Sequence, residues 1–209
     1  MPLSKLLTMI VVIFLLLPSY VFASEPSPLK LNPEDRKDLL RIEDYLNEIK
    51  NLRAKFLQVA SNGAIATGRL LMARPGKIRF EYDPPSPILL VSDGYFLRYI
   101  DKKLEQVTHI WLKNTPIGFL VEEKIKIKNG LTVTKFSRGA KKLSVSIAKP
   151  KKPEQGSITL VFSDTPLTLK KWIVTDAQGI KTTVALIKTE RPKQINPALF
   201  EFNDPSQKK

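Results

Sequence analysis

The spacing of apolar residues changes near Gly63, and this change constrains the fold more than any other feature of the sequence. Residues 39–49 place apolar side chains three or four positions apart, as one face of a helix does. Beyond Gly63, apolar and polar residues alternate along most of the chain, and in residues 77–83 (KIRFEYD) every second side chain is apolar. A period of two belongs to β-strands with one buried face, so a mainly β fold is predicted.

Turn residues divide this alternating part of the chain into short strands. The predicted strands cover residues 68–74, 77–83, 88–91, 96–100, 106–112, 124–128, 131–136, 143–149, 157–163, 167–175 and 181–188. The dipeptides Pro75-Gly76, Asp93-Gly94 and Asn129-Gly130 are typical of the tight turns that join antiparallel neighbours. Because the chain lacks a strand–helix–strand rhythm, one antiparallel sheet is expected, and residues 24–209 are expected to form a single domain.

Two helical segments are predicted beside the strands. The first begins at Asn32, which can cap a helix, with Pro33 in the first turn. Its apolar stripe consists of Leu39, Ile42, Leu46, Ile49 and Phe56. This stripe predicts a helix that ends near residues 60–63. The second helix is short, beginning at Thr115-Pro116 and reaching Val121.

The strands have bulky apolar residues on one face and charged or hydroxyl residues on the other, as Ile125 and Ile127 between three lysines illustrate. This pattern predicts one curved sheet with a wet convex face and an apolar concave face. The predicted helices are too few to cover the concave face alone. The sheet therefore either closes into a barrel or remains an open shell with a cavity, and both arrangements occur in ligand carriers.

The N-terminus predicts a cleaved signal peptide over residues 1–23. Lys5 precedes an apolar run of twelve residues, Leu6–Leu17, and Val21-Phe22-Ala23 provides a small-residue cleavage site. The alternative, a retained membrane anchor, needs about 20 apolar residues. The chain has no cysteine, so it has neither disulfides nor a lipid-attachment cysteine. A soluble periplasmic protein is expected.

The chain is strongly basic, with 34 Lys and Arg against 20 Asp and Glu and a formal net charge of +14. Such an excess indicates an anionic partner or surface. Export argues against nucleic acid, so an anionic membrane surface is the expected counterpart.

Few side chains offer enzyme chemistry. His109 is the one histidine, and without cysteines or a second histidine it is not expected to hold a metal. The sequence contains no G-x-S-x-G, H-E-x-x-H or glycine-rich phosphate loop, so neither a catalytic site nor a cofactor is predicted. A hydrolase that uses carboxylates alone stays open, because its two acids need no fixed spacing.

An ordered set of short motifs is similar to a known family. The set comprises Phe56-Leu57-Gln58, Gly68-Arg69-Leu70, residues 74–82 (RPGKIRFEY), residues 87–94 (PILLVSDG), Thr115-Pro116 and residues 196–202 (NPALFEF). In this order the motifs resemble those of periplasmic outer-membrane lipoprotein carrier proteins, the LolA family, from about Leu39 to Asp204. The chain departs from the family at Arg98, where an aromatic residue is usual.

The resemblance implies a half-open β-barrel under a helical lid, without enzymatic activity or cofactor. Members of the family accept acylated lipoproteins from an inner-membrane releasing complex, shield their acyl chains and deliver them to the outer membrane. The acceptor expected here is an outer-membrane partner or an anionic membrane surface. The resemblance also ties Arg74, in the R-P motif, to opening and closing of the lid, and places Ile78 in the cavity wall.

Strand alternation places Arg74 on the same side as Leu70 and Met72, where its guanidinium can donate to backbone carbonyls of a lid. The alternative for Arg74 is a solvated charge at a hairpin end. The candidates for the acyl-chain cavity are Leu70, Met72, Ile78, Phe80, Tyr82 and Leu90. The candidates for the lid region are Trp111, Phe119 and Leu120. For both sets the alternative is ordinary core packing.

Three functions follow from these observations. The first is a carrier that shuttles lipoproteins from the inner to the outer membrane. The second is a periplasmic lipid- or lipoprotein-binding sensor of the same fold, and the third is a periplasmic hydrolase. The identity of a co-purified ligand distinguishes the first two, because a carrier retains tri-acylated protein and a lipid-binding protein retains phospholipid.

Overall fold

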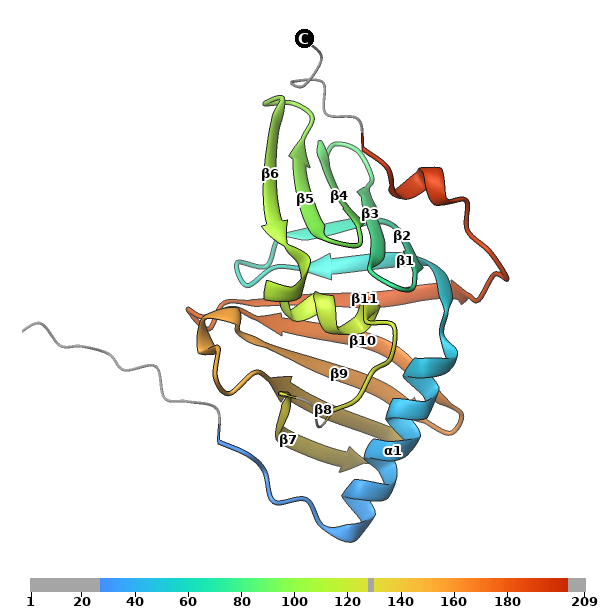
Figure 1. Cartoon of the computed structure of the whole chain (residues 1–209), viewed down its shortest axis with the longest axis vertical. Coiled ribbons are helices and arrows are strands. Elements are labelled where there is room, and N and C mark those ends of the chain that lie inside the picture. The colour runs from blue at the N-terminus through green and yellow to red at the C-terminus, as the bar shows by residue number, and fades with distance from the viewer. Residues whose placement is uncertain (1–26, 128–129, 203–209) are drawn as a thin grey trace, which may run out of the picture.

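The computed structural model describes residues 27–127 and 130–202, which contain one antiparallel sheet of eleven strands (Figure 1). The strands are β1 (Asn51–Val59), β2 (Ile65–Ala73), β3 (Lys77–Tyr82), β4 (Ile88–Asp93), β5 (Phe96–Asp101), β6 (Gln106–Trp111), β7 (Thr132–Gly139), β8 (Lys142–Ala148), β9 (Ser157–Asp164), β10 (Leu167–Thr175) and β11 (Lys181–Glu190). Their order across the sheet is β6-β5-β4-β3-β2-β1-β11-β10-β9-β8-β7. Within the described residues the edge strands β6 and β7 do not pair with each other. The predicted half-open antiparallel barrel is therefore confirmed.

The sheet consists of two groups of consecutive strands that meet at one seam. Strands β1 to β6 form one group, β7 to β11 form the other, and the seam is the antiparallel pair of β1 and β11. Phe56 lies opposite Leu186 at this seam, and Arg53 lies opposite Glu190. The two strands at the centre of the sheet thus come from opposite ends of the folded chain.

In the described part of the chain, one α-helix and four short 3₁₀ helices accompany the sheet. They are α1 (Pro33–Glu48), η1 (Leu112–Asn114), η2 (Pro116–Val121), η3 (Pro153–Gln155) and η4 (Pro197–Phe200). As predicted, Asn32 caps α1, its side chain accepting a hydrogen bond from the Asp35 amide at 2.7 Å. Figure 1 shows α1 crossing the strands of the second group, with η2 lying over the middle of the sheet. No helix in residues 27–127 and 130–202 is long and apolar enough to span a bilayer.

The predicted extension of the first helix to residues 60–63 is wrong. Helix α1 ends at Glu48, and the next nine-residue element is strand β1. In β1 the buried side chains Leu52, Ala54 and Phe56 alternate with exposed Arg53 and Lys55. Phe56 therefore belongs to the sheet, and the helical stripe ends at Ile49, where the backbone becomes extended.

The strand predicted over residues 124–128 is also wrong for its described part, since 124–127 form a loop; residue 128 lies outside the described residues. The loop backbone bonds to side chains of α1 instead of to a neighbouring strand. The Ile125 amide donates to Asn47 Oδ1 at 2.8 Å, and the Ile127 amide donates to Glu43 Oε1 at 2.7 Å. The two isoleucines are nevertheless fully buried, because the loop presses them into the core.

The main core fills the concave side of the sheet. It joins apolar side chains of α1, including Ile42 and Leu46, to inward-facing residues of the strands and to η2. The register places Leu70 opposite Phe80 and Met72 opposite Ile78, so these side chains share the concave face.

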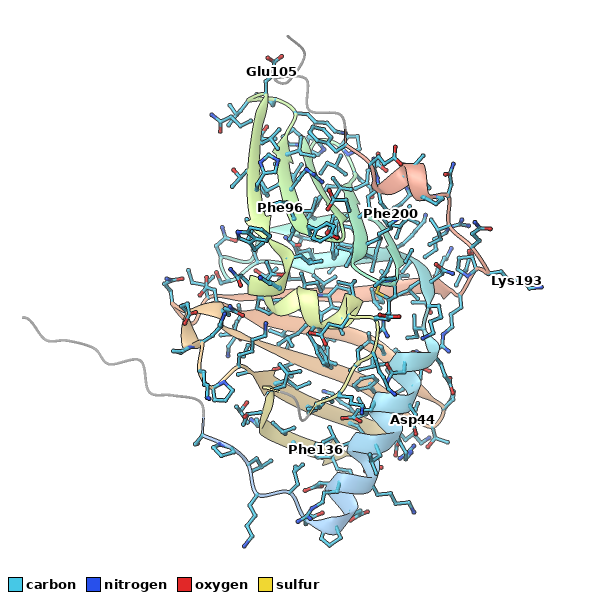
Figure 2. All side chains as sticks on the ribbon, viewed as in Figure 1. Asp44, Phe96, Glu105, Phe136, Lys193 and Phe200 are labelled. Atoms are coloured by element: carbon cyan, nitrogen blue, oxygen red, sulfur yellow. The ribbon has the colours of Figure 1, made fainter. Side chains whose placement is uncertain are left out.

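A second, smaller core lies on the convex side, which corrects the expectation that this side is uniformly wet. Leu89, Val91 and Ile100 of β4 and β5 are buried beneath Ile195 and Phe200 of the C-terminal segment. Phe200 lies over β3 and β4 (Figure 2). The segment that carries η4 is therefore an integral part of the fold.

Candidate functional site

The centre of the concave wall is built by strands β2 and β3. Four of the six predicted cavity residues, Leu70, Met72, Ile78 and Phe80, are at most 5% exposed and belong to the main core. They come together because alternation along each strand turns every second side chain inward and the antiparallel register aligns them across strands.

The other two predicted cavity residues, Tyr82 and Leu90, lie toward the rim of this wall. The Tyr82 hydroxyl donates to Gln58 Oε1 at 2.7 Å, and burial raises the pKa of Tyr82 to about 12. Leu90 is half-buried and lies opposite Phe80 on one side and opposite Tyr99 on the other. Tyr99 is 40% exposed, so the apolar wall continues outward until it reaches solvent.

A short segment closes the concave side from above; we call residues 112–127, which include η1 and η2, the lid. Thr115 caps η2 as the sequence predicted, its hydroxyl accepting from the Gly118 amide at 3.2 Å. Phe119 and Leu120 are each 4% exposed and point into the main core. Trp111 lies just outside the lid: it ends β6, is 49% exposed and packs on Phe96 with ring centroids 4.3 Å apart.

Arg74 connects the wall to the lid. It follows β2, and its Nε donates to the carbonyl oxygen of Leu120 at 2.9 Å. Beside it, the Gly76 amide donates to the carbonyl oxygen of Val121 at 2.7 Å. Burial lowers the pKa of Arg74 to about 10, while the charge of Glu122 opposes this shift. At that pKa the guanidinium stays charged at neutral pH, so the Arg74–Leu120 bond has a charged donor.

The space enclosed between wall, lid and helix is almost filled. Its lining consists of Leu46, Ile49, Leu52, Leu70, Met72, Arg74, Ile78, Leu120, Leu169 and Trp172. The remaining cavity measures about 10 Å³, barely room for one water molecule. An acyl chain does not fit into this space as the structure has it.

Helix α1 is tied to the sheet by ion pairs. Asp38, 7% exposed, accepts from Arg41 of the same helix at 2.6 Å and from Arg138 of β7 at 3.0 Å. Arg41 also bonds to Asp164 at 3.0 Å. Burial raises the pKa of Asp38, but the hydrogen bonds from Arg138 and Arg41 outweigh it and hold the pKa below its ordinary value. Ion pairs thus tie α1 to β7 and β9, whereas Arg74 makes the side-chain bond to η2.

A larger, open pocket of about 500 Å³ lies next to the Arg74–Leu120 contact. It is bounded by the β2–β3 turn with Gly76, the β4–β5 turn with Tyr95, and lid residues such as Val121 and Glu122. Glu122 is exposed at the edge of this pocket, and partial desolvation raises the pKa of its carboxyl against the opposing charges of Lys149 and Arg74. A molecule bound in this pocket would contact both the lid and the β2–β3 turn, whose Gly76 amide bonds to the lid at Val121.

Several residues of the site were missed in the sequence. Trp172 and Leu169 of β10 line the cavity, although β10 is distant from β2 in the chain. The Asp38–Arg41 pair has helical i,i+3 spacing and was detectable, whereas its bond to Arg138 spans 100 residues. Arg98 faces the convex side and pairs with Asp93 at 2.7 Å, so it takes no part in the concave wall.

These features define a class of protein: a half-open β-barrel whose apolar concave side is covered by one α-helix and a short segment with 3₁₀ helices. The family model described as outer membrane lipoprotein carrier protein LolA matches residues 47–203, and the chain belongs to this family. The resemblance inferred from the motifs is therefore confirmed.

Similar proteins occur in several bacteria. A protein named outer-membrane lipoprotein carrier protein in Azotobacter vinelandii is 27% identical over 205 residues, covering 91% of this chain and 93% of its own. One of the same name in Legionella pneumophila is 29% identical over 177 residues, covering 78% and 84%. An uncharacterized protein of Rickettsia prowazekii is 24% identical over 179 residues, covering 86% and 83%.

Proposed function

We propose that this protein carries acylated lipoproteins across the periplasm, from an inner-membrane releasing complex to the outer membrane. The observation that carries the proposal is an apolar concave wall, closed by a lid that Arg74 fastens through one carbonyl of η2. A permanent core needs no such fastening, whereas a carrier needs a closed empty state that its cargo can open. The names of the relatives in Azotobacter and Legionella support the same function.

The energies are compatible with opening by cargo. A hydrogen bond from a charged donor contributes about 1.5–3 kcal/mol. Burying an acyl chain yields about 0.8 kcal/mol per methylene, so about two to four methylenes offset the bond between Arg74 and Leu120. An acyl chain can also replace the apolar contacts that Leu120 and Phe119 make with the wall. The lid also bonds to Gly76, Asn47 and Glu43, so cargo that lifts η2 must offset the Gly76–Val121 bond as well as the Arg74–Leu120 bond.

The proposal assigns residues 24–209 to one carrier domain, a periplasmic location and no enzymatic activity. The signal peptide over residues 1–23 lies outside the described residues and stays a prediction. The pocket of about 500 Å³ beside the lid supports contact with a releasing or accepting partner there, because a partner group would press on the lid next to Arg74.

The test combines identification of the ligand with its location. Protein purified from its native periplasm is analysed by mass spectrometry under non-denaturing conditions, and tri-acylated protein is the expected ligand. A photo-crosslinking amino acid at position 80 then replaces inward-facing Phe80, and the matched control carries it at position 81, whose side chain faces the other side of β3. Crosslinks to acyl chains are expected from position 80 alone.

Two results would contradict the carrier function. Bound phospholipid without lipoprotein would favour the lipid-binding sensor. Equal crosslinking from positions 80 and 81 would show that acyl chains do not enter the concave side.

A further inference from the structure

Exposed apolar side chains are concentrated on one hairpin. The described residues expose eleven large apolar side chains; four of them lie on the hairpin of residues 96–111, and Tyr95 lies in the turn directly before it. These five are Tyr95, Tyr99, Leu104, Ile110 and Trp111, exposed by 74, 40, 60, 40 and 49%. Isolated exposed apolar residues are normal on a protein surface, but a concentration of this kind marks an interaction site.

This hairpin, formed by β5 and β6, is the end of the sheet. Strand β6 is an edge strand, and the β5–β6 turn projects at one extremity of the molecule, where Figure 2 labels Glu105. The turn is held in shape by Asp101, whose carboxylate accepts from the amides of Lys103 at 2.9 Å and Leu104 at 3.0 Å. Leu104 is thus presented to solvent by an ordered turn.

Apolar groups lie on both faces of the hairpin. Tyr99 and Ile110 share the concave face with Leu97, whereas Trp111 lies on the convex face with Phe96. A protein partner that packed against one face would leave the other exposed. A lipid interface surrounds an inserted hairpin on both faces, and amphipathic Tyr and Trp side chains are favoured at that depth.

The charges of the hairpin indicate the charge of the surface that it binds. Residues 95–113 contain four basic and two acidic side chains; of these, Arg98 is paired with Asp93 and Asp101 is hydrogen-bonded within the turn. Lys102 and Lys103 precede Leu104 at the tip and Glu105 follows it, while Lys113 lies over the Trp111 ring at 5.3 Å. A second copy of the chain would bring the same positive groups together, which disfavours pairing through β6. Anionic headgroups would neutralise them.

An apolar row connects the hairpin to the cavity wall. Leu70, Phe80, Leu90 and Tyr99 are consecutive cross-strand neighbours on β2, β3, β4 and β5. Leu70 is 1% exposed, Phe80 5% and Tyr99 40%, while Leu90 is half-buried. The row therefore leads from the closed site to the part of the hairpin that faces solvent.

We propose that the β5–β6 hairpin docks the protein on a bilayer of anionic phospholipid. We call its contact residues, Tyr99, Lys102, Lys103, Leu104, Ile110 and Trp111, the hairpin surface. Leu104 enters the interfacial region, the two lysines contact the headgroups, and the row through Tyr99 and Leu90 gives acyl chains an apolar path between bilayer and cavity. This inference rests on the proposed function, since it assigns the element that meets the membrane when cargo is exchanged.

The experiment measures co-sedimentation of the mature protein with vesicles of phosphatidylglycerol and of phosphatidylcholine. Each lysine near an anionic surface contributes about fivefold to binding. The variant Lys102→Glu/Leu104→Glu is therefore expected to bind phosphatidylglycerol vesicles at least about tenfold more weakly than the unaltered protein. The matched control, Ile180→Glu/Lys181→Glu, makes the same kind of change at two exposed residues where the β10–β11 connection enters β11, and it is expected to retain most binding.

A second readout is tryptophan fluorescence. The chain has two tryptophans, and Trp172 is buried at 2% exposure, so a blue shift on adding vesicles reports on Trp111. The inference is overturned if phosphatidylglycerol is not preferred, if the two double variants bind equally, or if Trp111 emission does not shift. It is also overturned if sedimentation velocity shows a dimer of the unaltered protein that the hairpin variant abolishes, because a second copy would then occupy this surface.

The outcomes separate this inference from the proposed function. Capture of a fluorescent tri-acylated peptide is measured without vesicles in the same variants. Loss of vesicle binding with normal capture supports the docking role of the hairpin. Hairpin-dependent vesicle binding without any capture would support docking and contradict the carrier function. Normal capture of the peptide by a protein that does not bind vesicles would support the carrier function and contradict docking.

Discussion

Replacing Arg74 by leucine tests the central element of the proposed cycle. In the closed structure Arg74 Nε donates to the Leu120 carbonyl, and cargo must break this bond to lift η2. Leucine has no donor and fits the surroundings of Met72 and Ile78, which line the same cavity. We expect Arg74→Leu to fold, to hold cargo more tightly and to release it more slowly.

The size of the effect follows from the bond that is lost. A charged donor to a carbonyl contributes about 1.5–3 kcal/mol, and this amount favours the empty closed state over the loaded one. Since about 1.4 kcal/mol corresponds to a factor of ten, cargo affinity should rise about 10- to 150-fold. The guanidinium also costs free energy to bury, as its lowered pKa of about 10 indicates, so removing it does not unfold the protein.

The assay follows a fluorescent tri-acylated peptide as it leaves the protein for excess unlabelled acceptor vesicles. The dissociation rate should fall with the rise in affinity, and circular dichroism confirms folding. The matched control is Arg79→Leu, because Arg79 also donates to a backbone carbonyl, that of Leu199 at 3.1 Å, but on the convex side. Unchanged affinity and release in Arg74→Leu, or equal effects in both variants, would refute the role of the Arg74–Leu120 bond.

Three further predictions concern the fold around the site. Gly68→Ala should lower the free energy of unfolding by about 2 kcal/mol or more in urea titrations, because a Cβ would collide with a β3 carbonyl and a β1 ring, while Gly139→Ala should be neutral. Asp38 has a lowered pKa in the fold, so its stabilising effect is complete above the ordinary value of 3.8 and is lost as the pH falls below it; Asp38→Asn should flatten that part of a pH–stability profile. Phe200→Ala should cost about 3–5 kcal/mol of unfolding free energy, whereas exposed Leu199 should tolerate alanine.

Each of these three predictions has a contrary result. If Gly68→Ala is as stable as Gly139→Ala, then β1 and β3 move apart to accommodate the added Cβ without loss of unfolding free energy. If the unfolding free energy of Asp38→Asn depends on pH as that of the unaltered protein does, the ion pairs of Asp38 do not help to hold α1 in place. A neutral Phe200→Ala change would show that the convex core is dispensable.

Alternation predicted the sheet well because it is a local property. In residues 77–82 the polarity of each side chain indicates which face of the sheet it occupies, and the short turns then set the register between neighbouring strands. Alternation could not predict which distant strands lie beside this wall. Trp172 and Leu70 meet only because β1 and β11 pair, and the sequence between them carries no trace of that pairing.

The two wrong elements have a common cause. Phe56 continues the helical spacing of α1, and the lysines around Ile125 and Ile127 imitate a strand. In both places partners distant in the chain decide the structure. Strand β1 is held by β2 and β11 on its two sides, whereas residues 125–127 find no strand and bond to Asn47 and Glu43. Local patterns specify what a segment can become, and the available neighbours select among those possibilities.

The seam between β1 and β11 has a consequence for how the molecule forms. Arg53 and Glu190, which face each other there, are 137 residues apart, so the two groups of strands can assemble separately but join only when the last strand is present. Contacts of such long sequence separation slow folding. A nascent chain that stops before Lys181 would hold two incomplete half-sheets with unpaired central edges, and such edges invite aggregation or proteolysis. The ten residues of β11 therefore complete the sheet in the last step of its assembly.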